Sequence, residues 1–410
     1  MMSKLNKKKI FNDPVYGFIT INHTIIFDLI EHPYFQRLRR IKQLGMTHLV
    51  YPGALHTRFH HCIGAMHIMQ KAIEVLRSKG HEITDKEAEG VSIAILLHDI
   101  GHGPFSHALE HSIVDGISHE EISTLFMDEL NQKFKGKLDL ALTIFRNQYK
   151  KKFLYQLVSS QLDMDRIDYL KRDSFYSGVS EGAVNSDRII TMLTVKNDEL
   201  AIEEKGIYSI ENFIIARRLM YWQVYLHKTV LAGENLLVNI LKRAKEIATN
   251  GEELFCTPPL KEFLYNQYNL QSFKDNPKIL KTFALLDDID IMASVKVWTN
   301  HSDKTLSTLC KMITNRDLYK IKLQKKKFDK SEINDIADKV KTKLKLTDHE
   351  ISYFVFQNSI VNNAYNPKMD NINILLKNGE MLDIKEAADT FNISALSTPV
   401  KKWFICFPQH

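Results

Sequence analysis

Histidine is concentrated in one part of this sequence. Ten of the 17 histidines lie between His56 and His119, where an even distribution would place about three. The stretch "LLHDIGHGPFSH", residues 96–107, follows an apolar run and holds three of them beside Asp99. Because imidazole is a common metal ligand and a proton carrier near neutral pH, this segment predicts a chemical site.

The apolar periodicity of three predicted helices turns four of these polar side chains inward. His61 extends the apolar stripe of residues 58–78, and His98 extends that of residues 88–102 with Asp99 beside it. Asp165 lies on the core side of residues 153–175. Taken singly, each could be an ordinary core histidine or a helix cap. Together, beside the Gly-His-Gly-Pro helix break, they favour a divalent metal, because burying them unpaired is costly.

Mixed nitrogen and oxygen ligands narrow the choice of metal. One divalent transition metal per site, manganese, iron, cobalt, nickel or zinc, is favoured over magnesium alone. The four cysteines, Cys62, Cys256, Cys310 and Cys406, are scattered and form no C-x-x-C pair. The sequence therefore predicts neither a disulfide framework nor a thiolate zinc site.

The segments around these residues are predicted to be mainly helical. "GFITIN" near the start alternates as a strand or hairpin does, and helical spacing begins after Pro33. Helical periods dominate from about residue 60 to 245, and residues 211–248 predict one long helix or two joined near Gly233. "TPP" at 257–259 interrupts the pattern, which resumes to about 345.

The last 65 residues change character. "ISYFVF" alternates, "NINILL" and "MLDI" flank an Asn-Gly pair as in a hairpin, and "KKWFICF" is β-prone. We therefore predict a mainly α fold. It divides into a catalytic domain at 1–245, a helical accessory region at 246–345 and a small α+β C-terminal subdomain at 346–410.

The order of the motifs resembles a known family. "HTRFHH" is followed 37 positions after His61 by "HD", and 66 positions after Asp99 comes "DMDRIDYLKRD". This resembles the H…HD…D pattern of the HD superfamily, whose catalytic domain is a helical bundle. "RLRRIKQLG", "YPGALHTRFHH", "SHEE" and "LDMDRIDYLKRDSFYSGV" are similar to the deoxynucleoside triphosphate triphosphohydrolase branch, which includes the vertebrate sterile-alpha-motif and HD-domain enzyme. The resemblance runs from about residue 30 to 245.

The resemblance implies a reaction and roles for further residues. Water attacks the α-phosphorus of a deoxynucleoside triphosphate (dNTP), and deoxynucleoside and triphosphate leave, with extra magnesium accompanying the triphosphate. The metal ligands implied are His61, His98, Asp99 and Asp165. The catalytic residues implied are His102, His107, His119 and Glu110. The substrate-binding residues implied are Gln43, Leu44, Arg58, Arg166, Tyr169, Asp173, Arg217 and Tyr225.

Two of these positions depart from the family pattern. His107 is the best candidate to protonate the leaving 5′-oxygen, but Glu110 stands near it where the vertebrate enzyme has aspartate, which leaves its orienting role open. Arg166 stands where relatives often have lysine, so a planar guanidinium group replaces a compact ammonium group.

Composition and charge leave the partners open. A net charge of +6 and a pI near 8.8 suit an anionic ligand without requiring one. No apolar stretch approaches the length of a membrane span, and we expect a cytoplasmic protein. The resemblance implies a homo-oligomer, dimer or tetramer, and a regulatory nucleotide, which would make the enzyme allosteric.

Two other functions compete. One is an HD-type nucleotidase or phosphodiesterase, although three arginines and three further histidines exceed what one phosphate needs. The other is a non-catalytic nucleotide sensor or a nucleic-acid-binding protein. The run "KIKLQKKK" from residue 320 could contact phosphates, but it has no interleaved aromatic residue and is more simply a solvated face. The basic segment at Lys325, Lys326 and Lys327 is also a hypothetical effector site.

Overall fold

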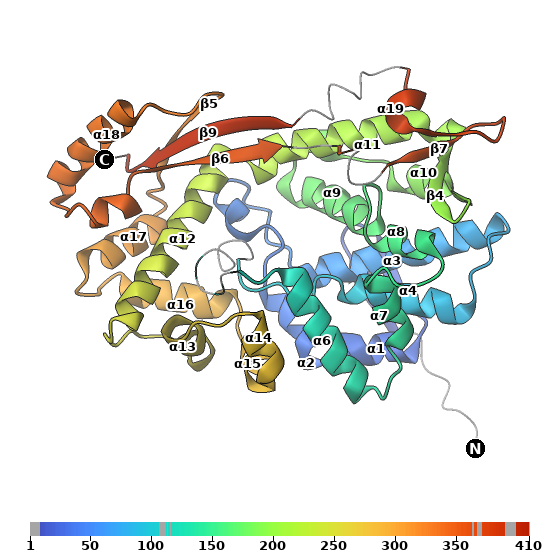
Figure 1. Cartoon of the computed structure of the whole chain (residues 1–410), viewed down its shortest axis with the longest axis horizontal. Coiled ribbons are helices and arrows are strands. Elements are labelled where there is room, and N and C mark those ends of the chain that lie inside the picture. Colours follow the sequence, from blue (N-terminus) through green and yellow to red (C-terminus); the bar gives the residue numbers. More distant parts are fainter. Residues whose placement is uncertain are drawn as a thin grey trace.

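A computed structural model describes residues 9–105, 112, 114, 116–362, 365–366, 371–389 and 399–409. Helices dominate it, with small sheets at the edges (Figure 1), so the prediction of a mainly α fold is confirmed. In the described part of the chain, no helix is long and apolar enough to cross a membrane.

The chain begins with an antiparallel hairpin and a series of short helices. The predicted strand at "GFITIN" is the second strand of this hairpin. The helix expected after Pro33 is only four residues long and continues as a tight 3₁₀ turn, while a separate helix precedes it. The elements are β1 (Lys9–Asp13), β2 (Gly17–Ile21), α1 (Thr24–Glu31), α2 (Pro33–Gln36) and 3₁₀ helices at Arg37–Arg40 and Gly45–Leu49.

The helical body follows and packs α3 against both α4 and α9. Its elements are α3 (Arg58–Ser78), α4 (Asp85–Leu97), α6 (His119–Lys133), α7 (Asp139–Phe145), α8 (Lys152–Val158), α9 (Met164–Ser177), α10 (Ser186–Thr191), β3 (Leu193–Lys196), β4 (Glu199–Glu203), α11 (Ile207–Met220) and α12 (Lys228–Thr249). The hairpin of β3 and β4 was not predicted. Its turn, Asn197-Asp198, has positive φ at both residues. Tight hairpin turns require this conformation, and Asn and Asp adopt it more readily than most residues.

The long helical segment at 211–248 breaks earlier than expected. Residues Tyr221–Tyr225 form a π-helical turn after α11, and α12 starts at Lys228. Gly233 lies inside α12, where a Cβ atom would come within 2.9 Å of the Leu49 side chain. The glycine therefore allows close packing of α12 and does not end a helix, so the prediction of a junction there is wrong.

Most of the elements that follow pack around α12, whereas β7, β8 and α19 lie against β4 and α11. Together they are α13 (Pro258–Tyr265), α14 (Leu270–Asp275), α15 (Pro277–Phe283), α16 (Asp288–Trp298), α17 (Lys304–Thr314), β5 (Lys320–Gln324), α18 (Lys330–Leu344), β6 (Phe356–Asn362), β7 (Asn373–Leu375), β8 (Met381–Asp383), α19 (Ile384–Ala387) and β9 (Val400–Phe407). "ISYFVF" is not a strand as predicted, since Glu350–Tyr353 form a 3₁₀ turn and β6 begins only at Phe356.

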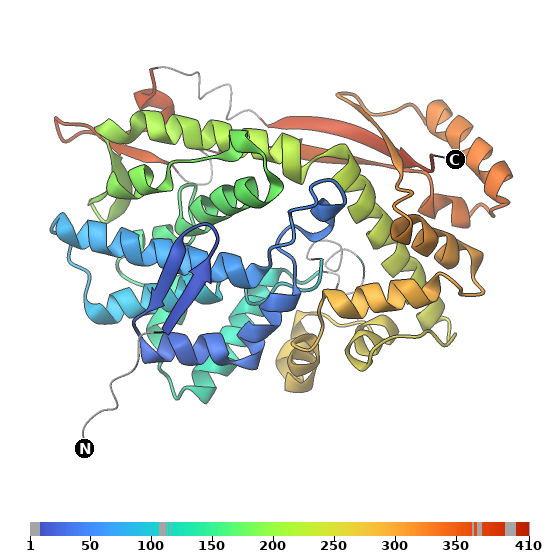
Figure 2. The same ribbon diagram turned by 180° about the vertical axis from the view of Figure 1, so that it is seen from behind.

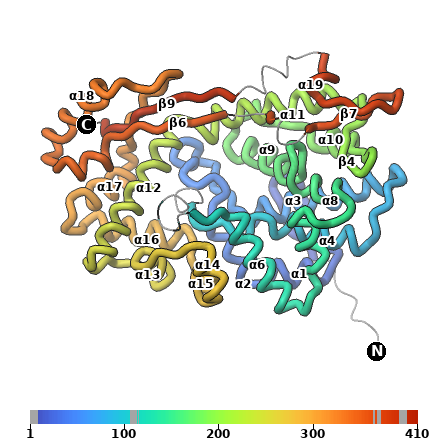
Figure 3. The backbone as a smooth tube through the Cα atoms, in the orientation of Figure 1, coloured from blue at the N-terminus to red at the C-terminus, as the bar shows by residue number. Residues whose placement is uncertain are grey.

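The C-terminal strands join sheets begun earlier in the chain. The predicted hairpin around Asn378-Gly379 is confirmed as β7 and β8, and β7 extends the β3–β4 hairpin in parallel to β4. The predicted strand at "KKWFICF" is confirmed as β9, the central strand between β5 and β6. Figures 2 and 3 show this sheet across the start of α12 and the adjoining end of α11, away from α3 and α4. The division at residues 245 and 345 stays a prediction.

Candidate active site

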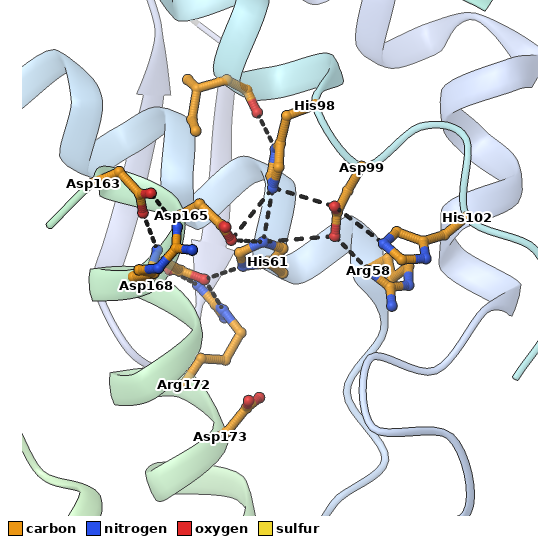
Figure 4. Close-up of polar contacts among 12 residues, drawn as sticks. Arg58, His61, His98, Asp99, His102, Asp163, Asp165, Asp168, Arg172 and Asp173 are labelled. Carbon is orange, nitrogen blue, oxygen red and sulfur yellow. Dashed lines mark hydrogen bonds and ion pairs between the residues drawn. The ribbon is translucent and has the colours of Figure 1, made fainter. Parts of the chain in front are cut away.

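Four of the predicted side chains meet where three helices converge. His61 comes from the first turns of α3, His98 and Asp99 follow the end of α4, and Asp165 lies in the first turn of α9 (Figure 4). The Nε2 atom of His61 lies 3.3 Å from Nε2 of His98, 3.1 Å from Asp165 Oδ1 and 3.8 Å from Asp99 Oδ2. The Nε2 atom of His98 lies 3.4 Å from both carboxylates.

The other nitrogen of each imidazole is fixed by an acceptor outside this group. Nδ1 of His61 donates to Asp168 Oδ2 at 2.7 Å, and Nδ1 of His98 donates to the Ile95 carbonyl at 2.6 Å. Both rings therefore present the lone pair of Nε2 to the centre of the cluster. Hydrogen-bond acceptors that lie outside a metal site impose this orientation on metal-ligating histidines.

Asp168 is itself held by a buried ion pair that the sequence analysis missed. Arg172 donates to both Asp168 oxygens, at 2.9 and 3.0 Å, and also to Asp13 of β1 at 2.8 Å. A Cβ atom on Gly64 of α3 would lie only 2.0 Å from the Arg172 guanidinium. The spacing of four between Asp168 and Arg172 was visible, but on a helix it is equally typical of a surface pair.

The protonation of the cluster follows from this crowding. Burial alone would lower the pKa of His61, but hydrogen bonds to Asp165 and Asp168 raise it to about 10. Burial would raise the pKa of Asp99, but His98, His102 and Arg58 hold it well below its usual range. The ionised carboxylates of the cluster therefore require a positive charge next to them. Two oriented imidazoles and two carboxylates fit a divalent transition metal, which would replace the protons.

A second histidine pair extends from Asp99. His102 Nε2 lies 3.2 Å from Asp99 Oδ1, and the His102 ring stacks on His119 with 3.7 Å between ring centres. Burial, followed by the charge of Arg58, lowers the pKa of His102 to about 3. His102 is therefore a neutral imidazole near pH 7. The predicted catalytic residues His107 and Glu110 lie outside the described residues.

An open cavity adjoins Arg58, which also forms an ion pair with Asp99. The cavity has a volume of about 280 Å³, close to the lower end of the usual range for small-molecule sites. Four predicted substrate residues line it together with Phe105, Tyr221 and others: Gln43, Leu44, Arg58 and Tyr225. Most of them come from the short segments before α3 and from the turn between α11 and α12.

Asp173 lies behind this cavity in a buried hydrogen-bond network. The Tyr225 hydroxyl donates to one of its oxygens at 2.8 Å, and His56 Nε2 donates to the other at 2.7 Å. The Tyr169 ring stands between the two regions, 6.2 Å from the Tyr225 ring and 6.5 Å from that of His61. His56, to which the sequence analysis gave no role, thus orients Asp173.

The other two predicted phosphate ligands lie on a different side of Tyr169. Arg166 pairs with Asp163, the N-cap of α9, and Arg217 donates to Gln161 at 3.2 Å. Arg166 and Gln161 line a second hollow of about 340 Å³. The structure therefore does not bring Arg58, Arg166 and Arg217 into one cavity.

Several buried polar atoms near the cluster have no hydrogen-bond partner in the described part of the chain. Among the described residues, several buried side-chain atoms without a hydrogen-bond partner belong to predicted substrate or catalytic residues. They are Oε1 of Gln43, Nδ1 of His102, and Nε of Arg166 and Arg217. Buried polar groups are nearly always paired in folded proteins, so such a concentration is typical of a binding site.

Comparison with known proteins gives consistent matches. An HD domain model matches residues 58–173, and an HD associated region model matches residues 184–255. The uncharacterized protein YwfO of Bacillus subtilis is 36% identical, with 77% of this chain and 72% of that protein covered. The deoxynucleoside triphosphate triphosphohydrolase SAMHD1 homolog of Dictyostelium discoideum is 31% identical over 62% of this chain, and this chain spans about half of its length, 52%.

A solved structure is similar over its whole length. It is a phosphohydrolase from Bacteroides thetaiotaomicron, 53% identical, with a TM-score of 0.95 and coverage of 98% of this chain and 100% of that one. The fold described above is therefore shared with a protein described as a phosphohydrolase.

Proposed function

The chain belongs to the HD domain family of metal-dependent phosphohydrolases, and from that premise we propose that it hydrolyses dNTPs to deoxynucleoside and inorganic triphosphate. The observation that carries the proposal is the position of the His-Asp cluster. It lies beside unpartnered Gln43 and His102 atoms and an open cavity. The triphosphohydrolase relative from Dictyostelium, matched over 62% of this chain, supports this substrate class.

We propose that His61, His98, Asp99 and Asp165 hold the metal. When bound there, a divalent ion supplies a Lewis acid for a phosphoryl oxygen and lowers the pKa of an adjacent water. Manganese, iron, cobalt, nickel and zinc all suit the donor set.

The cationic and imidazole side chains act on the phosphates in this proposal. Arg58, Arg166 and Arg217 bind phosphate oxygens where negative charge develops. His102 is neutral near pH 7 and its Nε2–H group faces Asp99, so it is not the proton donor in this proposal. His119 stacks on it, and His107 remains the proposed proton donor to the leaving 5′-oxygen.

The sugar side of the proposal rests on Asp173. His56 and Tyr225 each occupy one lone-pair direction of its carboxylate, and about four are available, so it can still accept from a 3′-hydroxyl. Gln43 would contact the same hydroxyl, Leu44 would pack against the sugar, and Tyr169 would leave no room for a 2′-hydroxyl. A site built on paired hydroxyls discriminates more strongly than apolar fit does.

The products separate this proposal from its rivals. We would incubate each purified dNTP, singly and in mixtures, with manganese, cobalt or magnesium, and compare Asp165→Ala by chromatography. We expect deoxynucleoside and triphosphate from the unmodified chain and neither from the variant. Release of orthophosphate would identify a nucleotidase, and binding without turnover a sensor.

Activity only in mixtures would identify the regulatory nucleotide that we propose on the same resemblance. We also propose a homo-oligomer, since relatives are commonly dimers or tetramers. The oligomeric state should be measured by light scattering with and without nucleotide.

A further inference from the structure

The lysine run of residues 320–327 acquires an aromatic partner in the folded chain. In the sequence it holds five lysines and no aromatic residue. In the structure β5 pairs with β9, and Trp403 of β9 lies directly opposite Gln324. The side-chain nitrogen of Lys327 lies 5.5 Å from the centre of the Trp403 ring, and that of Lys401 lies 4.5 Å from it.

These side chains share one face of the sheet. Residues directly opposite each other on neighbouring strands point to the same side, and side chains alternate along a strand. We call this side the Trp403 face. Its members in β5, β6 and β9 include Lys322, Gln324, Ser359, Lys401 and Trp403.

The Trp403 face is open at one end and covered at the other. Ile405 shares this face and is fully buried, and the ion pair between Lys322 and Glu332 places the start of α18 over that end. Lys401 is exposed, and Trp403 is half-buried. Figure 1 shows the sheet at the outer edge of the molecule, on the side of α11 and α12 away from α3 and α4. The open end is therefore separate from the candidate active site.

Positive charge predominates on this surface. The strands β5, β6 and β9 and the loop at 325–328 contain no Asp or Glu, whereas Lys320, Lys322, Lys325, Lys326, Lys327 and Lys401 lie on the Trp403 face or in the loop beside it. Lys402 points to the opposite face, over the Trp222 ring. Lys322 is paired with Glu332, and the lysines of the loop are exposed. A concentration of lysines around one tryptophan has both parts that recognition of unpaired nucleotides requires, cations for phosphates and a ring for a base.

We propose that the Trp403 face binds single-stranded nucleic acid. One base stacks on Trp403, displacing Lys327 and Lys401 from the ring, and these lysines together with Lys325 and Lys326 contact the flanking phosphates. The exchange costs little, because an exposed cation–π contact is weak. Gln324 and Ser359 flank the ring, and the exposed Val361 lies opposite Lys401. The apolar surface beside the ring is therefore small, and the lysines favour a polyanion over an apolar protein surface.

The test is fluorescence anisotropy of the full chain with labelled 20-nucleotide oligo-dT and oligo-U. Stacking of one base predicts about tenfold weaker binding for Trp403→Leu, with Trp403→Phe close to the unmodified chain. Joint replacement of Lys325, Lys326 and Lys327 by Gln should reduce the slope of log affinity against log salt by about two, since each phosphate contact contributes about 0.7. The matched control replaces the exposed Lys135, Lys137 and Lys150 by Gln and should leave the slope unchanged.

The proposal is overturned by any of three results. They are no binding at low salt, equal losses in the matched control, and binding to vesicles of anionic lipid that exceeds binding to either oligonucleotide. Circular dichroism of Trp403→Leu separates lost binding from lost folding, and the lysine variant provides the test if that protein does not fold. Because binding is measured without turnover, the result is independent of the proposed dNTP hydrolysis.

Discussion

Asp168 fixes the orientation of the most buried predicted metal ligand. It accepts the Nδ1 proton of His61 at 2.7 Å, which leaves Nε2 facing the other three side chains. Asp168→Asn keeps the size of the side chain but removes the charge that selects this tautomer. We expect metal affinity to fall by roughly tenfold to hundredfold, as for other partners of ligating histidines. Calorimetric titration with Mn²⁺ would measure it.

Asp128→Asn is the matched control for that titration. Asp128 pairs with Arg146 on the exposed surface, so the same chemical change should leave metal affinity intact. A folded Asp168→Asn protein with unaltered Mn²⁺ affinity would show that His61 does not depend on this partner.

For single residues, the sequence is predictive where the apolar stripe of a helix shows which side chains face the core. The apolar stripes were enough to predict that His61, His98, Asp99 and Asp165 face inward, and the structure brings them together. Asp168 and Arg172 were missed because a charged pair at a spacing of four fits a solvated helix equally well. Only the folded chain shows that Asp13, more than 150 residues earlier, closes the same network.

Helix α3 can approach α9 because it has no side chain at Gly64. A Cβ atom there would lie 2.0 Å from Arg172 Nη2 and 2.3 Å from Asp168 Oδ1. Helix propensity alone would favour Gly64→Ala by about 1 kcal/mol. Because the buried ion pair would have to move, we expect a net loss of about 2 kcal/mol in the free energy of unfolding and weaker metal binding.

Urea denaturation of Gly64→Ala and of Ser78→Ala would measure that loss. Ser78 is exposed at the end of the same helix, so its replacement should change stability by less than about 0.5 kcal/mol. Equal stability of the two variants would mean that the helices separate at little cost.

The start of α4 depends on a buried carboxylate. Burial alone would raise the pKa of Glu87, but hydrogen bonds from the Thr84 backbone, Lys151 and Tyr149 lower it to about 2. The unfolded chain, with an ordinary pKa near 4.5, therefore binds this proton more readily. The stabilisation by Glu87 is thus complete above about pH 5 and is lost as the pH falls through 4.5 toward 2.

Glu87→Gln should accordingly destabilise the chain by about 2 kcal/mol at pH 7. The difference between the two proteins should narrow below about pH 5. Urea midpoints at pH 7, 5 and 4 test this, and a difference that stays constant with pH would assign the effect to shape and not to charge.

Elements were predicted best where a local signal sets their boundaries. The Asn-Gly turn between β7 and β8 is such a signal. The capping pair of Thr84 and Glu87 is another, but it was not used, and the predicted segment at 88–102 starts three residues after the true start of α4. The π-helical turn at Tyr221–Tyr225 has no comparable signature. The turn places Tyr225 against Asp173, which belongs to helix α9 from elsewhere in the chain. Apolar periodicity carries no information on that contact, so the predicted helix continued across the turn.

Over the whole molecule, strand pairing is the feature that the sequence could not supply. β9 pairs with β5 about 80 residues earlier, and β7 pairs with β4 about 170 residues earlier. Such contacts are not local, and no pattern within a single strand specifies its partner. The lysine run was for the same reason interpreted without Trp403.

The pairing of β9 with β5 also bears on the predicted domain boundary at residue 345. Phe404, Ile405 and Cys406 of β9 are at most 2% exposed, and β9 is the central strand of its sheet. A chain that ends at residue 345 would leave β5 unpaired and uncover apolar side chains beneath it. We expect that chain to aggregate, and the full chain to unfold in one transition by differential scanning calorimetry. A soluble 1–345 chain that binds Mn²⁺ as the full chain does would instead establish an independent C-terminal unit, because the cluster of His61, His98, Asp99 and Asp165 would then form without β9.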